Sequence, residues 1–380
     1  MKKNLAFLSL FSVAFVCQIR GTIAPGMELL YNYYSHYSIA TISLMITIVS
    51  IAVIPASYLT SRCVGSTITY KQSIIFMNIC LLLGGVAPAF IDNLYVVLFF
   101  RLIFGIGIGI GISLNKPIIK EYYTSEKQIK YLGYTTIIAS LGTIFFQSLV
   151  GVFSNISTKA MFLAYLPIII TLFLSFYIPD IPLKKQEAIS HHKFKLNKNL
   201  LFYVFLFLTL NMLLTCFSIN TSSLIAEKSI DNLTITTVTS NNINSLFSIL
   251  SGLLFGKIYN KYHNSFFPFV IFLCIIAFGL YYIAPAKSVI YIASAILGFS
   301  YNLVILYIFL FAANSTKEDS AKAGGYIGIA AGIGGFLATF LIFAFQHLFD
   351  EVIYSIIILI IITLIIVEII FLVRKKELPR

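Results

Sequence analysis

Long apolar runs recur along the whole chain, and each is about as long as a helix that crosses a lipid bilayer. A transmembrane helix takes about 20 apolar residues, because it rises about 1.5 Å per residue through a hydrocarbon core of about 30 Å. The lipid interior offers no partner for unpaired backbone groups, so runs of this length are helices. The pattern predicts about twelve transmembrane helices, at about 5–25, 37–59, 73–91, 94–114, 132–153, 160–178, 200–219, 237–258, 266–284, 288–312, 323–347 and 352–373.

The longest polar stretch between these runs lies near the middle of the chain. It is rich in lysine and divides the apolar runs into two sets of six. We expect an N-terminal six-helix bundle at 1–178, a basic cytoplasmic linker at 179–199, and a C-terminal six-helix bundle with a short basic tail at 200–380. Equal halves of this kind are typical of an internal duplication. The predicted fold class is therefore an all-α integral membrane protein with two pseudo-symmetric six-helix bundles.

Composition and charge agree with a membrane protein. Hydrophobic residues make up 59% of the chain and charged residues 11%, whereas a soluble domain carries about 25% charged residues. The net charge of +12 does not indicate a nucleic-acid-binding face, because the basic residues lie in short loops between apolar runs. Loops on one side hold basic residues throughout, and those on the other side hold only Lys159, Lys228 and Lys287. Both termini are therefore predicted to be cytoplasmic.

The sequence predicts neither a metal site nor a cofactor. The five cysteines share no CxxC spacing, and four of them lie inside apolar runs. We interpret them as small packing residues rather than ligands or disulfide partners. We expect no cofactor.

The fourth run combines an arginine with alternating glycines. It reads RLIFGIGIGIG, from Arg101 through Gly105 and Gly109 to Gly111. Alternating glycines lack the spacing of a dinucleotide fingerprint. Small residues four apart instead let transmembrane helices approach closely. A charged residue inside a span marks a functional hypothesis, and a second one, Arg20, lies in the first run.

These features resemble the major facilitator superfamily of secondary transporters, with its drug-exporter-like branch. That family carries a loop motif after spans two and eight, which reads Gly, three residues, Asp, a basic residue and then Gly. In this chain the residues that resemble the first copy are Ser57, Ser61, Arg62 and Gly65. Those that resemble the second copy are Gly256, Asn260 and Lys261. Serine and asparagine stand where the family has aspartate. The fourth span of the family begins with an arginine followed by glycines, as do Arg101, Gly105 and Gly107.

The resemblance implies roles for particular residues. The two loop motifs would form a cytoplasmic gate, and Arg101, Gly105 and Gly109 would serve the conformational cycle or proton coupling. Spans one, four, seven and ten line the central cavity in this family. The polar residues there, with one from span five, are the candidates for solute binding: Gln18, Arg20, Gln147, Asn211, Thr215, Tyr301 and Asn302.

The charge balance of the spans predicts the kind of solute. The acidic residues lie in loops or near the ends of spans, as do Glu28, Asp92 and Glu368. A cavity with two arginines and no mid-membrane carboxylate would be positive, so we expect a small amphipathic, anionic solute with Arg20 as its main electrostatic contact. We expect alternating access, coupling to a proton or another ion, and efflux by analogy with the family.

Other functions remain open. A proton-coupled multidrug efflux pump is the alternative within the same class. A non-transporting sensor or scaffold descended from a transporter, or a membrane-embedded lipid-modifying enzyme, represents another class. The leading prediction is not an enzyme. It is a monomer in the plasma (inner) membrane of a bacterium, whose partners are the lipid bilayer, the solute and the coupling ion.

Overall fold

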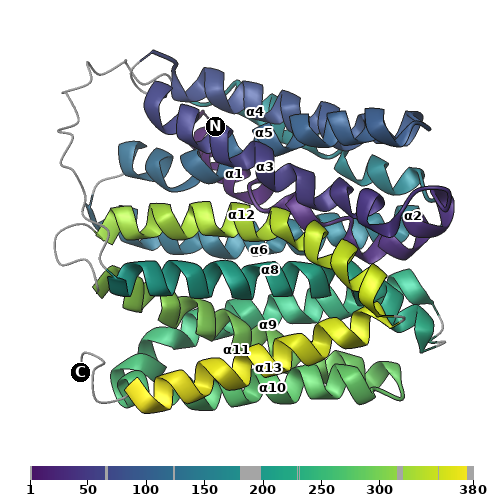
Figure 1. Ribbon diagram of the computed structural model, residues 1–380. Coiled ribbons are helices and arrows are strands. Elements are labelled where there is room, and N and C mark those ends of the chain that lie inside the picture. Colours follow the sequence, from purple (N-terminus) through teal and green to yellow (C-terminus); the bar gives the residue numbers. More distant parts are fainter. Residues whose placement is uncertain are drawn as a thin grey trace. The chain divides into compact units, whose positions relative to one another are not determined.

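The chain folds into helices in both of its halves (Figure 1). The computed structural model describes residues 2–374 apart from 65–66, 123–124, 180–197, 229, 231, 315–319 and 350. Within these residues there are thirteen α-helices and five short 3-10 helices, and no β-strand. The helices group into two units, Met1–Phe194 and Lys195–Arg380. Most of the predicted linker at 179–199 lies outside the described residues.

The first unit is built around one central helix. This helix, α5, packs closely on α3 and α4, and α1 packs on α6 and α7. The elements of the unit are α1 (Lys2–Val16), η1 (Ile19–Gly21), η2 (Ala24–Gly26), α2 (Met27–Tyr33), α3 (Ile39–Cys63), α4 (Tyr70–Val86), η3 (Ala87–Phe90), α5 (Leu94–Tyr122), α6 (Ser125–Ser154), η4 (Ala160–Tyr165) and α7 (Ile168–Ser175).

The second unit shows the same order of close pairs. Its second long helix, α9, packs on the fourth, α11, as α3 packs on α5 in the first unit. In addition, α8 packs on α12, and α10 packs on α11 and α13. The elements are α8 (Lys198–Glu227), α9 (Leu233–Tyr262), η5 (His263–Phe266), α10 (Phe267–Ile283), α11 (Lys287–Asn314), α12 (Ser320–Leu348) and α13 (Val352–Arg374).

Local sequence explains where several helices begin. The Ser38 hydroxyl accepts a hydrogen bond of 3.1 Å from the Thr41 amide at the start of α3. Thr69 and Gln72 form a reciprocal capping box at the start of α4. Such caps satisfy amide groups that have no partner in the first helical turn.

The predicted membrane spans correspond to these helices. Eight of the described helices are long and apolar enough to cross a bilayer, and a bent pair in the N-terminal region makes a ninth. Two apolar helices are shorter, Ala160–Ser175 and Phe267–Ile283. The helix α9 is long, but it is more polar than the others. These helices stand at the twelve predicted positions, and the all-α transmembrane fold class is confirmed.

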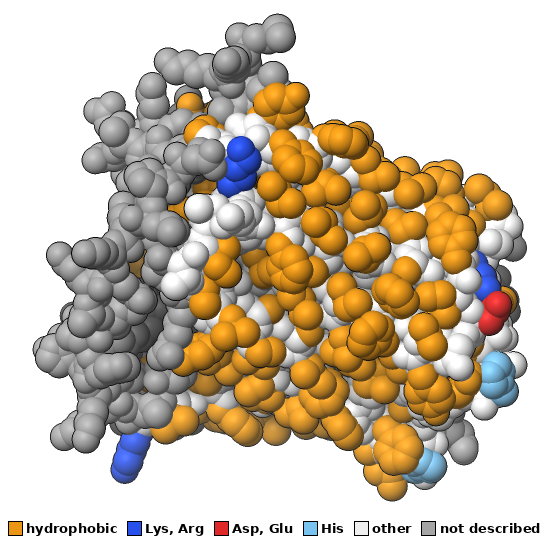
Figure 2. Space-filling view, turned by 90° about the horizontal axis from the view of Figure 1, so that it is seen from above, with side chains coloured by type: hydrophobic (Ala, Val, Ile, Leu, Met, Phe, Trp, Pro, Cys, Tyr) orange, Lys and Arg blue, Asp and Glu red, His pale blue; other side chains and the backbone are white. Residues whose placement is uncertain are grey.

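The surface matches a lipid environment. Figure 2 shows a face covered by hydrophobic side chains, with charged groups near its margins. Large apolar side chains are widely exposed, among them Phe205 at 67% and Phe90 at 75%. A water-facing surface rarely carries so large a continuous apolar patch, so these helices present it to lipid.

Candidate functional site

The first predicted span is interrupted where the sequence places Arg20. Helix α1 ends at Val16, two 3-10 turns follow, and α2 begins at Met27, with a bend of 45° between the two parts. Pro25 has no amide hydrogen to donate within a helix, and Gly21 and Gly26 have low helix propensity. The local sequence therefore favours the break. The prediction of one continuous helix over 5–25 is therefore wrong. Hydropathy shows that the run is long enough to cross the membrane, but not where the backbone leaves the helical conformation.

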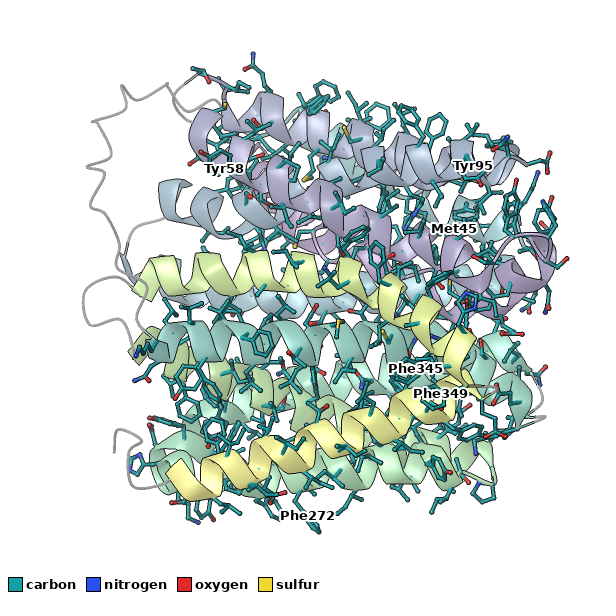
Figure 3. All side chains as sticks on the ribbon, viewed as in Figure 1. Met45, Tyr58, Tyr95, Phe272, Phe345 and Phe349 are labelled. Carbon is teal, nitrogen blue, oxygen red and sulfur yellow. The ribbon has the colours of Figure 1, made fainter. Side chains whose placement is uncertain are left out.

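Arg101 ties this break to the neighbouring helix. Its guanidinium donates from Nε to the Met45 carbonyl at 2.8 Å, and from Nη2 to the Arg20 carbonyl at 3.3 Å. The side chain is fully buried. Met45 lies within α3, as labelled in Figure 3. Arg101 thus joins α5, α3 and the interrupted span through backbone acceptors.

Aromatic rings complete the surroundings of this arginine. The guanidinium carbon lies 4.4 Å from the centre of the Phe104 ring and 5.8 Å from that of Tyr165. A cation is attracted to the faces of such rings. The nitrogen Nη1 has no hydrogen-bond partner among the described residues. The Arg101 side chain is therefore enclosed by protein, and its role in the conformational cycle or proton coupling stays a prediction.

The other two predicted residues of this region are more accessible. Arg20 is partly exposed and Gln18 is exposed. The Gln18 carbonyl accepts a long contact of 3.5 Å from the Thr143 hydroxyl of α6. Within the described part of the chain, the Arg20 guanidinium makes no ion pair.

The second unit encloses a polar cavity. It measures about 230 Å³. Three helical faces meet there, because lining residues recur every three or four positions on α8, α9 and α11. The lining residues are Leu214, Phe217, Ser218, Thr221, Asn241, Asn244, Ser248, Tyr281, Leu297, Gly298, Tyr301, Asn302 and Ile305. None of these side chains is a carboxylate, lysine, arginine or histidine.

A close helix crossing holds two sides of this cavity together. Ser248 of α9 donates to the Gly298 carbonyl at 3.0 Å, and Asn302 of α11 donates to the Ser248 carbonyl at 2.9 Å. A β-carbon at Gly298 would overlap the carbonyl of Asn244, so glycine is required here. The cavity is therefore bounded by a rigid pair of helices.

The predicted solute-binding residues divide between these places. Tyr301 and Asn302 line the cavity. Thr215 and Asn211 do not, and the Thr215 hydroxyl donates to the Asn211 carbonyl one turn away. Gln147 is buried in α6, and its side-chain oxygen has no partner among the described residues. Whether these five residues bind solute stays a prediction.

Sequence reasoning missed several residues of the cavity. Asn241, Asn244 and Ser248 lie on α9, and Ser218 and Thr221 lie on α8. A signal was present, because α9 begins LTITTVTSNNINS, an unusually polar run for a span. Polar residues three and seven positions apart in such a run share one helix face.

The predicted helix-packing glycines do lie at a helix crossing. A β-carbon at Gly105 would stand 2.5 Å from the Val49 carbonyl oxygen, and one at Gly109 would stand 2.7 Å from that of Val53. Ser57, predicted in the gate motif, donates to the Gly109 carbonyl at 3.0 Å. These glycines therefore allow α5 to lie directly on α3.

The rest of the gate motif cannot be compared between its copies. Gly65 and the side chains of Ser61 and Arg62 lie outside the described residues. In the second copy, Asn260 and Lys261 are exposed at the end of α9, and space is open around Gly256. The gate assignment stays a prediction.

A charged contact lies outside the spans, beside the ends of α2 and α5. Asp92 forms an ion pair with Lys159 and accepts a hydrogen bond of 2.8 Å from the Tyr33 hydroxyl. These contacts, that with Lys159 foremost, lower the pKa of Asp92, and the pKa of Lys159 is raised by Asp92 in turn. Together these three residues link the end of α2, the segment before α5 and the segment before η4.

A broken first span, glycine-mediated crossings and a polar cavity are features that occur together in membrane transporters. The profile of the Major Facilitator Superfamily matches residues 7–339. The chain belongs to that family of transporters. No curated protein sequence matches it.

Solved transporter structures share the fold at low sequence identity. The nucleoside transporter NupG is 13% identical with a TM-score of 0.79, and the match covers 99% of each chain. A bacterial homologue of the human lysosomal transporter Spinster, inward-facing and occupied, is 12% identical with a TM-score of 0.74, covering 98% of this chain and 97% of that one. The peptide transporter POT in complex with sulfate is 12% identical with a TM-score of 0.75, covering 99% and 94%.

Proposed function

We propose that the protein is a secondary active transporter that moves a small amphipathic solute with an acidic group by alternating access. Coupling to a proton or another ion provides the driving force, and efflux is the direction. The observation that carries the anionic preference is Arg20, a partly exposed cation at the break in the first span. The Arg101 guanidinium is enclosed, so Arg20 is the better contact for an anion.

The distribution of acidic residues supports the same preference. Those in the described helices all lie within two turns of a helix end, namely Glu28, Glu121, Glu126, Glu227 and Glu368. A lipophilic cation would therefore find no carboxylate deep in these helices. An intramembrane charge without a partner favours a ligand of opposite charge.

Two alternatives follow from the same observations. Proton-coupled multidrug efflux, the activity of the drug-exporter-like branch, requires a group that binds cations, and an asparagine-lined cavity does so weakly. A sensor or scaffold would keep the binding site but would not move solute. Transport measurements separate both from the proposed function.

The test is transport into liposomes that contain the purified protein. A panel of organic anions and lipophilic cations is compared for wild type and Arg20→Gln. We expect wild type to exchange anions, and the variant to lose at least tenfold of this exchange, because one charged hydrogen bond contributes about 1.5–3 kcal/mol. Lys287→Gln removes an exposed cation at the start of α11 and serves as the matched control, with exchange unchanged.

The outcomes separate the alternatives. Exchange of cations alone, unaffected by Arg20→Gln, would establish multidrug efflux and overturn the anionic preference. Binding of anions without exchange would identify a sensor.

A further inference from the structure

The cavity of the second unit contains hydrogen-bonding groups that the described protein leaves unused. The Tyr301 hydroxyl is buried without a partner. The side chains of Asn241 and Ser218 form no hydrogen bond with the described residues. The Tyr301 hydroxyl is costly to bury unless something satisfies it, whereas the half-buried Asn241 and Ser218 offer their polar groups to whatever occupies the cavity.

The asparagine side chains also show which hydrogen-bonding groups are not used by contacts among the described residues. Asn302 uses its amide nitrogen to donate to the Ser248 carbonyl at 2.9 Å and the Ser251 hydroxyl at 2.8 Å. Asn244 donates to the Ser294 carbonyl at 3.4 Å. Their side-chain oxygens remain as acceptors, whereas Asn241 offers both donors and acceptors. The cavity therefore presents a mixed set.

This mixed set carries no formal charge. An anion in the cavity would face the asparagine oxygens, and a cation would face no carboxylate. Bringing a charge into such a place without a countercharge is unfavourable. A neutral group that both donates and accepts can satisfy every member of the set.

The volume limits the group further. About 230 Å³ is smaller than the roughly 300–1,000 Å³ of sites for drug-sized ligands. The cavity accommodates a single ring-sized group. Because the crossing at Gly298 fixes α9 against α11, the group meets a preformed arrangement, which lowers the entropic cost of binding.

We propose that this cavity binds an uncharged ring-sized group of the solute, one that bears hydroxyl or carboxamide functions. The inference rests on the proposed transport function and adds an uncharged part to the acidic solute proposed there. Polyols, nucleosides and aromatic amides share this chemistry, and the experiment distinguishes them.

The experiment uses the absence of tryptophan from the chain. Leu214→Trp places a single fluorescent reporter on the cavity lining in the full-length protein in nanodiscs. Each of three pairs combines a neutral probe with an anionic one: nicotinamide and nicotinate are nearly equal in size, whereas glucose phosphate and uridine monophosphate add a phosphate group to glucose and uridine. Each titration is repeated with Arg20→Gln added, which removes the separate attraction of anions.

We expect at least one uncharged probe to change the fluorescence, with an apparent Kd at least tenfold below that of its charged partner in the Arg20→Gln protein. Asn241→Ala and Tyr301→Phe should each raise that Kd about tenfold, the effect of losing one hydrogen bond in a buried site. The matched controls Asn155→Ala and Tyr282→Phe alter exposed residues outside the cavity and should leave it within twofold.

Three results would overturn the inference. They are equal or tighter binding of the charged partners in the Arg20→Gln protein, no effect of Asn241→Ala and Tyr301→Phe, or no response to any probe. The liposome assay keeps the two proposals distinct. Anion exchange that depends on Arg20 but not on Asn241 leaves the transport function standing and removes the assigned cavity. If the cavity binds neutral probes but the protein exchanges no solute, the assigned cavity stands and the proposed transport function is overturned.

Discussion

At the scale of single residues, Arg101 shows how a charge can be held in a membrane protein without a counterion among the described residues. Its acceptors are two backbone carbonyls, and its remaining surroundings are two aromatic rings. A charged residue costs on the order of 3 kcal/mol at the centre of a span, and Arg101 lies nearer to one end of the span Leu94–Asn115. Its hydrogen bonds, at about 1.5–3 kcal/mol each for a charged donor, offset that cost.

This balance leads to a prediction about two substitutions. Arg101→Met removes the buried charge together with its hydrogen bonds, so the free energy of unfolding should change by less than about 1.5 kcal/mol. Arg101→Lys keeps the charge, but one ammonium cannot reproduce the planar arrangement of the guanidinium. The lysine variant should be the less stable, by about 2 kcal/mol, as measured by thermal melting in detergent.

Transport should respond differently from stability. Both variants release the interrupted first span from α3, so we expect at least a tenfold loss of exchange in each. A methionine variant that transports normally would show that Arg101 is not required to hold the break.

The sequence revealed the charged residue but not its partners. Backbone carbonyls are present at every position, so no side-chain pattern distinguishes those of Met45 and Arg20. Tyr301 and Asn302 could be predicted because polar residues stand out in an apolar helix. Asn241 and Asn244 are two of many polar residues in α9, so the sequence does not distinguish them. The crossing with α11 shows that these two line a cavity.

At the scale of helices, glycine sets the distance between neighbours. Gly298 lies against the Asn244 carbonyl, whereas a β-carbon at Gly279 of α10 would meet nothing within 4 Å. The two glycines lie in the same unit and differ in the space around them. They form a natural pair for comparison.

We predict opposite effects of alanine at these two positions. Gly298→Ala forces α9 and α11 apart and should destabilise the protein by about 1–3 kcal/mol, the usual cost of overpacking. Gly279→Ala should be neutral or stabilising by up to about 1 kcal/mol, because alanine favours helix. Melting temperatures of the two variants provide the measurement, and equal melting temperatures would contradict the close crossing.

The positions of helices were more predictable than their continuity. Hydropathy located the spans because burial in lipid requires apolar length. It could not show that the first span breaks between Val16 and Met27, because hydropathy averaged over a whole span hides the few polar residues at the break. The sequence also predicts an ordinary span at 237–258, where the structure has the polar helix α9.

At the scale of the whole molecule, the twelve spans predicted from the sequence would place both termini on one side of the membrane. The distribution of basic residues predicts that this side is cytoplasmic, with Lys159, Lys228 and Lys287 on the other. The aspartate and lysine contact at Asp92 and Lys159 would then face outward.

Protease protection tests this arrangement. Epitope tags at the N- and C-termini should both be shielded in intact spheroplasts and both be cleaved in inverted vesicles. A cysteine placed at Lys159 should show the reverse accessibility to an impermeant reagent. Opposite results for the two tags would mean an odd number of spans.

The use of backbone acceptors by Arg101 has a consequence for how the protein tolerates mutation. Every amino acid supplies a carbonyl, so substitutions at Met45 and Arg20 leave the two acceptors in place while the local backbone persists. No substitution at Arg101 supplies the same donors. This contact alone leaves the side chains at Met45 and Arg20 unconstrained, whereas the solute contact proposed for Arg20 constrains that side chain separately. A saturation mutagenesis scored by transport should therefore tolerate conservative changes at Met45 but none at Arg101, and its result at Arg20 would report the solute contact instead.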